Sequence, residues 1–436
     1  MVRGVGVAAG AVTFGVYLVG SGRSYDYDSS ETVGSFIATP SLLDPFRRQL
    51  VYNNHPLFSF LDHLVYSAGG RSALDLRILP ILFGAAVVAI VVAWCAGRWG
   101  IVAAATAGLM LGANSSFAEL SRSVRGYSLL CLSAVVSTLL VDRLLTKPRR
   151  SLSAAYIVVV AAGIATHVYM LLVLLGQIGI VVARSGATRA WLTRWAAAIV
   201  LGALAYVDIG AAMVRSASRA GHVFRPRFPL ALLTTLLGGT RTTLVVLGLL
   251  ALVGAAAVFS RALLMSAAAV TAGVLVIWLW LAPLELYPRF LIWLAPPAAL
   301  AVAVAVRRFP LALPLVAAAA FLMVRLDAAH WSQDPLPDRQ AAVLVRATQS
   351  RGGNPCVFPL IRGSLLAYAH APKEVTRPTQ LRNCELVLTL AVDPQSLRLA
   401  ARRDFEHHWL LKAWTPMIVF SRLPQDELLS ARGHGA

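Results

Sequence analysis

Long apolar runs separated by short polar connections dominate the pattern of this chain. About eleven of these runs approach the roughly 20 residues that a helix needs to cross a bilayer. Their centres lie near Val12, Val88, Thr106, Ser133, Val160, Ile178, Leu204, Leu249, Val270, Leu300 and Val316. The pattern therefore predicts an all-α, polytopic membrane protein with about eleven transmembrane helices.

The first long polar segment, residues 21–79, has a periodic pattern of its own. We expect a helix there that ends at Gly69-Gly70, because apolar side chains recur at helical spacing. Its apolar face carries Leu57, Phe60, Leu61, Leu64 and Val65, and its polar face His55, Ser59, Asp62, His63 and Tyr66. This pattern is typical of an interfacial amphipathic helix, whose polar face we expect to point to the aqueous side.

Two shorter helices are expected in the same segment. One is an amphipathic piece from Pro40 to Leu50. The other begins near Asp28, which stands three residues before Glu31 in the spacing of a capping box, and continues through Val33, Phe36 and Ile37.

The composition changes at about Asp327, where apolar runs become short and polar residues frequent. We therefore assign residues 1–328 to a transmembrane module that carries the segment 21–79, and residues 329–436 to a small α/β domain. In that domain we expect helices at Ala341–Thr348 and Pro394–Arg403. Strands are expected at Cys356–Leu360, Leu386–Leu390 and Met417–Phe420.

The four cysteines fall into two groups. Cys95 and Cys131 lie in apolar spans, where a thiol packs as a small hydrophobic group. Cys356 and Cys384 each open an apolar run, and if these runs are neighbouring parallel strands both sulfurs lie at one edge. A disulfide there fits an oxidising exterior, and two free thiols in a reducing compartment are the alternative.

The charge of the chain follows its predicted topology. The formal net charge is +19 over 436 residues of which 58% are hydrophobic, but no basic stripe is interleaved with aromatics, so we expect no nucleic-acid partner. The basic loops predict a cytoplasmic N-terminus and an extracytoplasmic segment 21–79 and C-terminal domain. These loops contain Arg143, Lys147, Arg149 and Arg150; Arg184, Arg189 and Arg194; Arg261; and Arg307 and Arg308.

Ionisable residues gather at the predicted outer ends of the spans, namely Glu119, Arg122, Arg125, His167, Asp208, Glu285 and Arg289. A transporter would be expected to hold polar groups near the midplane, so this asymmetry favours a reaction site at the outer interface. Arg125 and Arg289 lie near Tyr127 and Tyr287, and a guanidinium suits a phosphate.

Snorkelling to the lipid headgroups is the alternative for any of these arginines, and we favour it for Arg47, Arg48 and Arg77. A basic outer loop with Arg215, Arg219, Arg225 and Arg227 could bind an anionic acceptor or anionic lipid.

Five short motifs follow one another along the chain. They are Tyr27-Asp28-Ser29, His55-Pro56-Leu57, Ser121-Arg122-Ser123-Val124-Arg125-Gly126-Tyr127, Thr166-His167-Val168-Tyr169 and Tyr287-Pro288-Arg289-Phe290. Their order resembles the GT-C superfamily of integral-membrane glycosyltransferases, which use polyprenyl-phosphate sugars and include protein O-mannosyltransferases and the lipid A aminoarabinose transferase. Ser29 and Ser123 depart from the family pattern, which has Glu at both positions. Asp26, Glu31 or Glu119 could supply the missing carboxylate.

The resemblance implies an inverting transfer of a hexose or pentose, such as mannose or arabinose, from a polyprenyl-phosphate donor to a cell-envelope glycan, lipid or protein. Asp28 would be the general base, and we expect neither a cofactor nor a metal. The expected substrate-binding residues are Asp26, Glu31, His55, Arg125, Tyr127, His167 and Arg289.

The resemblance also implies a multi-pass protein of the plasma or inner membrane. The alternative function is a transporter or flippase of a lipid-linked glycan. An assembly partner that kept the fold and lost activity is a third hypothesis.

Overall fold

The computed structural model forms two compact units. The structure describes residues 2–47, 54–185, 188–212, 228–238, 241–280, 287–331, 337–357, 373–374, 378–390, 405–411 and 417–426. Unit 1 comprises residues 1–19, 45–60 and 78–328, and unit 2 comprises residues 20–44, 61–77 and 329–436.

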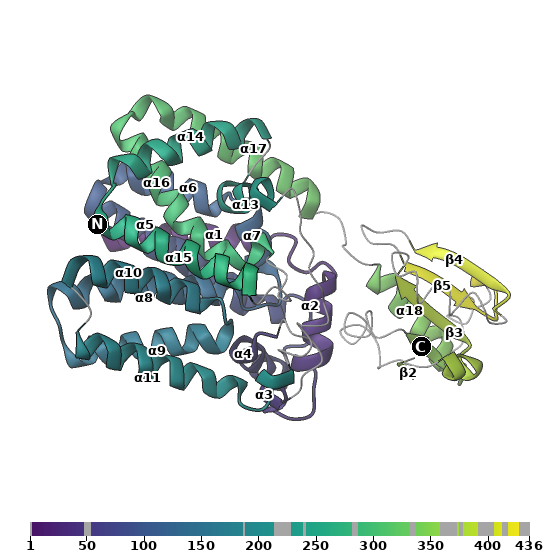
Figure 1. Ribbon diagram of the computed structural model, residues 1–436. Coiled ribbons are helices and arrows are strands. Elements are labelled where there is room, and N and C mark those ends of the chain that lie inside the picture. Colours follow the sequence, from purple (N-terminus) through teal and green to yellow (C-terminus); the bar gives the residue numbers. More distant parts are fainter. Residues whose placement is uncertain are drawn as a thin grey trace. The chain divides into compact units, whose positions relative to one another are not determined.

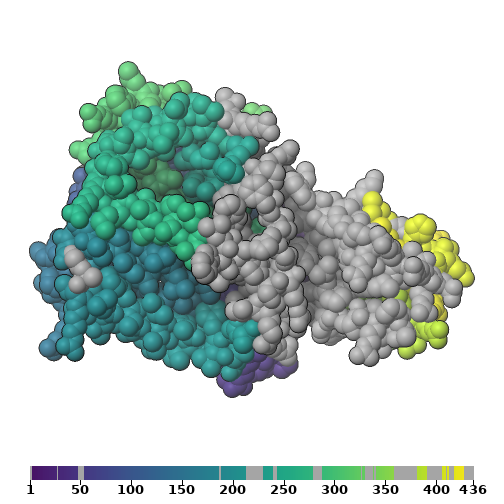
Figure 2. Space-filling view, in the orientation of Figure 1, coloured from purple at the N-terminus to yellow at the C-terminus, as the bar shows by residue number. Residues whose placement is uncertain are grey.

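Unit 1 is a bundle of apolar helices, which Figure 2 shows, in blue-green to green, packed against one another over the visible face. The ribbon in Figure 1 labels them in chain order. They are α1 (Val2–Leu18), α5 (Asp75–Trp99), α6 (Ile101–Gly112), α7 (Ser115–Arg122), α8 (Tyr127–Thr146), α9 (Arg150–Thr166), α10 (Met170–Ser185), α11 (Arg189–Ala203), α13 (Phe228–Leu237), α14 (Arg241–Ala257), α15 (Arg261–Trp280), α16 (Ala295–Arg308) and α17 (Leu313–Trp331).

Several of these helices can cross a bilayer. Within the described residues, three are long and apolar enough by themselves: Asp75–Trp99, Tyr127–Thr146 and Pro288–Arg308. The pair α6 and α7 passes the same test together with a bend of 60°. Six shorter apolar helices accompany them, so the count of eleven spans stays a prediction.

Small residues allow the helix backbones to approach closely, as expected for packing inside a membrane. Gly6 and Gly10 of α1 lie against Ala89 of α5, where an added Cβ would come within 2.6 to 2.8 Å of that residue. The predicted span around Leu204 is displaced, because α11 ends at Ala203 and continues as a 3-10 turn at Leu204–Tyr206.

The polar segment after α1 contains α2 (Tyr27–Thr32), a π-helical turn at Val33–Ile37, α3 (Asp44–Arg47) and α4 (Pro56–Ser67). The helix through Val33, Phe36 and Ile37 was therefore predicted correctly in outline. The helix expected at Pro40–Leu50 is only four residues long in the structure, which describes the chain there up to Arg47.

Helix α4 is amphipathic as predicted, and it ends before Gly69, whose φ of +101° favours glycine. The predicted direction of its polar face was wrong. His55, Ser59 and Asp62 are buried, whereas Leu64 on the apolar face is 43% exposed. The polar face of α4 thus points into the protein, and the apolar face is free to contact the membrane interface.

The C-terminal part of unit 2 has a helix and a mixed sheet. The helix is α18 (Asp338–Ser350), and the strands are β1 (Pro355–Val357), β2 (Lys373–Glu374), β3 (Leu386–Leu390), β4 (His407–Leu411) and β5 (Met417–Ser421). Their order is β2-β1-β3-β5-β4, with β1 parallel to β2 and β3, and β5 antiparallel to β3 and β4. The helix expected at 394–403 and the end of the strand expected at 356–360 lie outside the described residues.

The core of this domain lies where α18 meets the sheet. Ala341 and Val345 of α18 are buried together with Leu386 and Leu388 of β3 and Val419 of β5. On β3, Val387 belongs to a second cluster, because successive side chains of a strand point to opposite faces.

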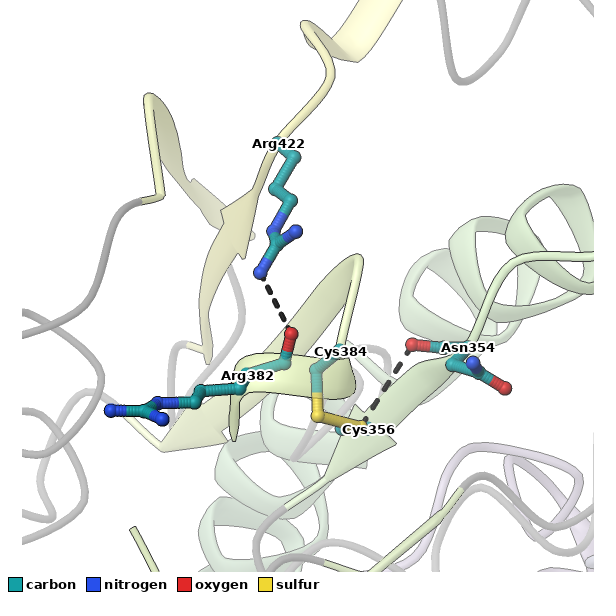
Figure 3. The surroundings of a disulfide bond; sticks show 5 residues. All are labelled: Asn354, Cys356, Arg382, Cys384 and Arg422. Carbon is teal, nitrogen blue, oxygen red and sulfur yellow. Dashed lines mark hydrogen bonds between the residues drawn. A yellow bond between two sulfur atoms is a disulfide. The ribbon is translucent and has the colours of Figure 1, made fainter. Parts of the chain in front are cut away.

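A disulfide joins Cys356 and Cys384, as expected from parallel neighbouring strands. The two Cα atoms are 5.7 Å apart, and Cys356 pairs with Val387 in the β1–β3 ladder. Figure 3 shows the bond beside the hydrogen bond from the Arg422 guanidinium to the Arg382 carbonyl, 2.9 Å long. Cys95 and Cys131 are free and buried, in agreement with a packing role.

Candidate functional site

The N-terminus of α2 is capped by Asp26. This residue has an extended backbone, with φ −71° and ψ 168°, and its carboxylate accepts hydrogen bonds from the Ser29 amide at 2.9 Å and the Ser29 hydroxyl at 2.7 Å. The N-cap is therefore Asp26 and not Asp28, for which the capping-box spacing had left a capping role open. The cap also gives Ser29 a local role at the position where the family pattern has Glu.

Asp28 lies in the first turn of α2, one residue inside the helix. Its side chain is half-buried, and its backbone carbonyl accepts a hydrogen bond from the Thr32 hydroxyl at 3.0 Å. Glu31, in the same helix, is also half-buried. Because the cap uses Asp26, the carboxylate of Asp28 is not needed to start the helix.

Arg77 binds the backbone just before this helix. Its guanidinium donates hydrogen bonds to the carbonyls of Ser21 at 2.7 Å, Arg23 at 2.5 Å and Ser24 at 2.8 Å, and it lies 5.1 Å from the Tyr25 ring centroid. Arg77 is only 2% exposed, so the prediction that it snorkels to headgroups was wrong. It instead fixes the chain that leads into Asp26 and Asp28.

Arg122 performs a similar task in unit 1, at the end of α1. Its guanidinium donates to the carbonyls of Tyr17 at 2.8 Å and Val16 at 2.7 Å, which are among the last carbonyls of that helix. The Tyr17 ring lies 5.2 Å below the guanidinium carbon. Arg122 therefore caps a helix C-terminus.

Five predicted substrate-binding residues come together in one cluster of unit 1. Arg125 Nε donates to His55 Nε2 at 3.2 Å, and the His55 ring lies 4.9 Å from the Tyr127 ring and 4.8 Å from the His167 ring. His167 lies 5.3 Å from the Phe290 ring, next to Arg289. We call His55, Arg125, Tyr127, His167 and Arg289 the arginine–histidine cluster.

Two aromatic residues complete this cluster and were not among the expected site residues. Phe290 stacks on Tyr127 with a centroid distance of 6.4 Å, and Tyr169 lies 5.0 Å from Phe290. The Arg289 guanidinium carbon lies 4.7 Å from the Tyr287 ring and 5.7 Å from the Phe290 ring. Both residues belong to short motifs noted in the sequence, where their aromatic character was the available signal.

Glycine at position 126 lets two parts of the cluster meet. A Cβ there would lie 2.5 Å from the Thr166 methyl group, 3.1 Å from His55 Nδ1 and 3.1 Å from the Phe58 Cβ. The loop that carries Arg125 can therefore approach the start of α4 and the end of α9 only without a side chain at this position.

The positive charge in the cluster is carried by its arginines and not by its histidines. Burial and the Arg125 guanidinium hold the pKa of His55 well below its ordinary value, and the same two effects lower the pKa of His167 to about 3. Both imidazoles are therefore neutral near pH 7. His167 Nδ1 accepts from the Tyr169 amide at 3.2 Å, which leaves its Nε2 to carry the proton.

Asp62 is a buried acid on the polar face of α4, the face that was expected to point to the aqueous side. Neither of its carboxyl oxygens has a hydrogen-bond partner among the described residues, and burial raises its pKa well above the ordinary value. Its spacing from His55, seven positions along α4, was the signal for a shared face.

An apolar cavity of about 530 Å³ lies in unit 1 among α5, α8, α10, α15 and α16. Its wall includes Val173 and Trp293, which follow His167 and Arg289 by six and four positions. Gln177 on the wall is satisfied by Tyr156 at 2.9 Å and by Ser137 at 2.7 Å, so the cavity presents little free polarity. Its lining suits a hydrocarbon chain.

Three other polar residues noted in the sequence are exposed, namely Glu119, Asp208 and Arg47. Arg48, Arg215, Arg219, Arg225, Arg227 and Glu285 lie outside the described residues. Among the described residues, no group of three or more His, Cys, Asp or Glu is arranged to hold a metal ion, and independence from metals stays a prediction.

No known protein-family profile matches the chain, and no curated protein matches it in sequence. Solved structures do resemble it. ArnT from Cupriavidus metallidurans in the apo state has a TM-score of 0.66 at 14% identity, over 98% of this chain and 99% of ArnT. The same protein bound to undecaprenyl phosphate gives 0.63 at 14% identity, over 96% and 98%.

The oligosaccharyltransferase of Archaeoglobus fulgidus, in complex with Zn and sulfate, is a more distant neighbour. Its TM-score is 0.55 at 12% identity, over 92% of this chain and 70% of that enzyme. The chain thus shares the overall fold of ArnT and of this oligosaccharyltransferase, in agreement with the resemblance that the sequence motifs carried.

Proposed function

We propose that this chain, which has the GT-C fold, is a membrane glycosyltransferase that uses a polyprenyl-phosphate sugar. The observation that carries the proposal is the arginine–histidine cluster in the same unit as an apolar cavity. ArnT, which has the same fold, has been solved with undecaprenyl phosphate, and this supports a lipid of that class as the donor.

The cluster offers what a lipid phosphate requires. Guanidinium groups remain charged at any physiological pH and bind phosphate oxygens in a bidentate manner. Each of the two neutral imidazoles beside them has one N–H group that can donate a hydrogen bond to the phosphate. As the bond to the sugar breaks, negative charge grows on the phosphate, and preorganised cations stabilise it without solvent reorganisation.

The apolar cavity would hold part of the prenyl chain. Val173 lies in the first turn of α10, which begins at Met170, three residues after His167 of the cluster. This order suits a headgroup at the cluster and hydrocarbon in the cavity.

Asp28 is our candidate for the general base. A carboxylate accepts the proton of the acceptor hydroxyl as the oxygen forms a bond to the anomeric carbon. The bond between that carbon and the phosphate oxygen breaks, and polyprenyl phosphate leaves. One displacement of this kind inverts the anomeric centre. Asp26 serves the helix cap, which favours Asp28 for this role.

The acceptor would be a cell-envelope glycan, lipid or protein on the outer face of the plasma membrane, and the sugar a hexose or pentose such as mannose or arabinose. Incubation of the purified protein with a panel of polyprenyl-phosphate sugars and acceptors tests the proposal, with release of free polyprenyl phosphate as the readout.

A detergent micelle has no separate compartments between which a lipid could be moved. A transporter or flippase would therefore release no free polyprenyl phosphate in this assay. Release that depends on acceptor supports the transferase, whereas no release with any donor, together with movement of the donor across vesicle membranes, would favour transport. The variant Arg125→Gln should lower the release by about 10²-fold or more, because it removes a charge next to the developing anion.

A further inference from the structure

A cationic cavity, separate from the arginine–histidine cluster, lies at the N-terminal end of α9 beside Arg194 of α11. It has a volume of about 430 Å³ and is lined by Pro148, Arg149, Arg150, Ser153, Ala154, Ile157 and Arg194. Figure 1 shows the two helices side by side. Nothing in the proposed transfer reaction uses these residues.

The two helices run in the same direction, so their N-terminal ends lie on the same side of unit 1, and α9 lines the cavity with its first turns. Arg194 near the start of α11 bonds Ser153 near the start of α9, and Gly202 near the end of α11 lies against Ile164 near the end of α9. Neither Arg149 nor Thr188, the residues before the two helices, caps its helix with a side chain. Two helix ends with positive partial charge therefore converge.

Arginine at these positions makes the site more positive. Cations are disfavoured at a helix N-terminus, yet Arg149 and Arg150 begin α9, and Arg194 lies against Ser153. Among the described residues, none of the three pairs with a carboxylate. The contrast is Arg184 of α10, which forms an ion pair with Asp142 of α8 at 3.0 Å.

One of these arginines is held in place. Arg194 Nε donates to the Ser153 hydroxyl at 3.0 Å, and its guanidinium carbon lies 4.7 Å from the ring centroid of Trp191, which is buried. The guanidinium is half-buried and keeps its terminal N–H groups available. Such preorganisation is what distinguishes a binding site from a group of solvated charges.

We propose that this cavity binds a phosphate group, carried by an anionic phospholipid at the membrane surface. The three arginines and two helix ends would contact the phosphate oxygens. Ala154 and Ile157 lie one to two turns further along α9 and would contact the first carbons of an acyl chain. Basic pockets between transmembrane helices recognise lipid headgroups in this way.

The test measures thermal stability of the full-length protein in neutral detergent with phosphatidylcholine. Phosphatidylglycerol should raise the Tm in a saturable manner, and the same concentration of inorganic phosphate should not. In Arg149→Gln/Arg194→Gln, the phosphatidylglycerol concentration for half of the shift should rise about tenfold or more. The control Arg307→Gln/Arg308→Gln removes two exposed arginines from the end of α16 and should respond like the wild type.

Equal responses of the two double variants would overturn the proposal, as would a wild type that phosphatidylglycerol and phosphatidylcholine stabilise alike. Inorganic phosphate could instead raise the Tm of the wild type and of the control in a saturable manner but not that of Arg149→Gln/Arg194→Gln. This result would support a phosphate site and assign it a soluble ligand. If that variant does not fold, the single variant Arg150→Gln, at an exposed position, replaces it, and native mass spectrometry of the wild type should show retained phosphatidylglycerol.

Discussion

At the scale of single residues, three aspartates of the N-terminal part of the chain lie in different environments. Asp26 caps α2, Asp28 stands inside the first turn, and Asp62 is buried without a hydrogen-bond partner among the described residues. Their environments, rather than their chemical type, separate them.

Asp26→Ala should destabilise the protein while sparing the chemistry. The loss of an N-cap costs about 1 kcal/mol, and the Ser29 amide and hydroxyl lose their acceptor. We expect a lower Tm in detergent and a rate of sugar transfer that stays within about threefold of the wild type at a temperature well below that Tm. A loss of transfer with unchanged Tm would mean that Asp26, and not Asp28, is the base.

Asp62→Asn should stabilise the protein, and more so as the pH rises. The folded-state pKa of Asp62 is raised, so above the ordinary pKa the unfolded chain ionises while the folded protein keeps the proton, and stability falls with rising pH. Asparagine removes that penalty. We expect the Tm of the variant to exceed that of the wild type at pH 8 and to match it near pH 4. Equal Tm differences at both pH values would show that Asp62 is ionised in the folded state.

At the scale of elements, two buried arginines hold the chain around the first helix. Arg122 caps the end of α1 within unit 1, and Arg77 binds three carbonyls between α1 and α2 within unit 2. Both side chains are buried, and neither points to the lipid.

Arg77→Gln should lower both stability and transfer. Each charge-assisted hydrogen bond contributes about 1.5–3 kcal/mol to stability. In the variant, the carbonyls of Ser21 and Ser24 stay buried but lose the hydrogen bonds that the Arg77 guanidinium donates. We expect a Tm several degrees lower and a reduced kcat at temperatures where the variant is folded, because the chain before Asp28 loses its anchor. The matched control is Arg71→Gln, which removes an exposed arginine from the same segment and should change neither quantity.

The elements also show what the sequence could and could not predict. The periodic pattern predicted α4, because helical spacing of apolar residues is a local property. The pattern could not predict whether the polar face of α4 contacts water or the protein interior, since polar side chains can form hydrogen bonds in both. Arg77 was misjudged for the same reason, because snorkelling and a buried anchor require the same residue in the same position.

The position of the helix cap and the strand β4 were missed for other reasons, whereas the strands expected at Leu386–Leu390 and Met417–Phe420 are present as β3 and β5. The pairs Asp26–Ser29 and Asp28–Glu31 both have the three-residue spacing of an N-cap and its partner. The extended backbone of Asp26 in the structure shows that this residue is the cap. The strand β4, His407–Leu411, begins with two histidines and lies at the edge of the sheet. Its sequence lacks the alternation of apolar and polar residues by which a strand is predicted. Four of the five motifs, in contrast, contribute residues to the arginine–histidine cluster, and the substrate-binding roles expected for these residues stay a prediction.

At the scale of the whole molecule, the two units differ in how they are stabilised. Unit 1 packs apolar helices through small residues such as Gly6 and Gly10. The C-terminal domain in unit 2 has a small sheet and a disulfide between positions 356 and 384.

Cys356→Ser/Cys384→Ser should destabilise the C-terminal domain specifically. A disulfide that closes a loop of 28 residues contributes about 3 kcal/mol by constraining the unfolded chain. We expect faster proteolysis within residues 337–426 of the full-length protein, with protection of the helices of unit 1 unchanged. The control Cys131→Ser removes a buried free thiol and should leave proteolysis of the C-terminal domain as in the wild type.

The central claim is that Asp28 removes the acceptor proton during transfer from a polyprenyl-phosphate sugar. The most direct measurement compares release of free polyprenyl phosphate by the wild type and by Asp28→Asn, with donor and acceptor present and equal Tm verified. We expect the variant to release it about 10²- to 10⁴-fold more slowly, as for loss of a general base. Full release by a folded Asp28→Asn protein would contradict the claim.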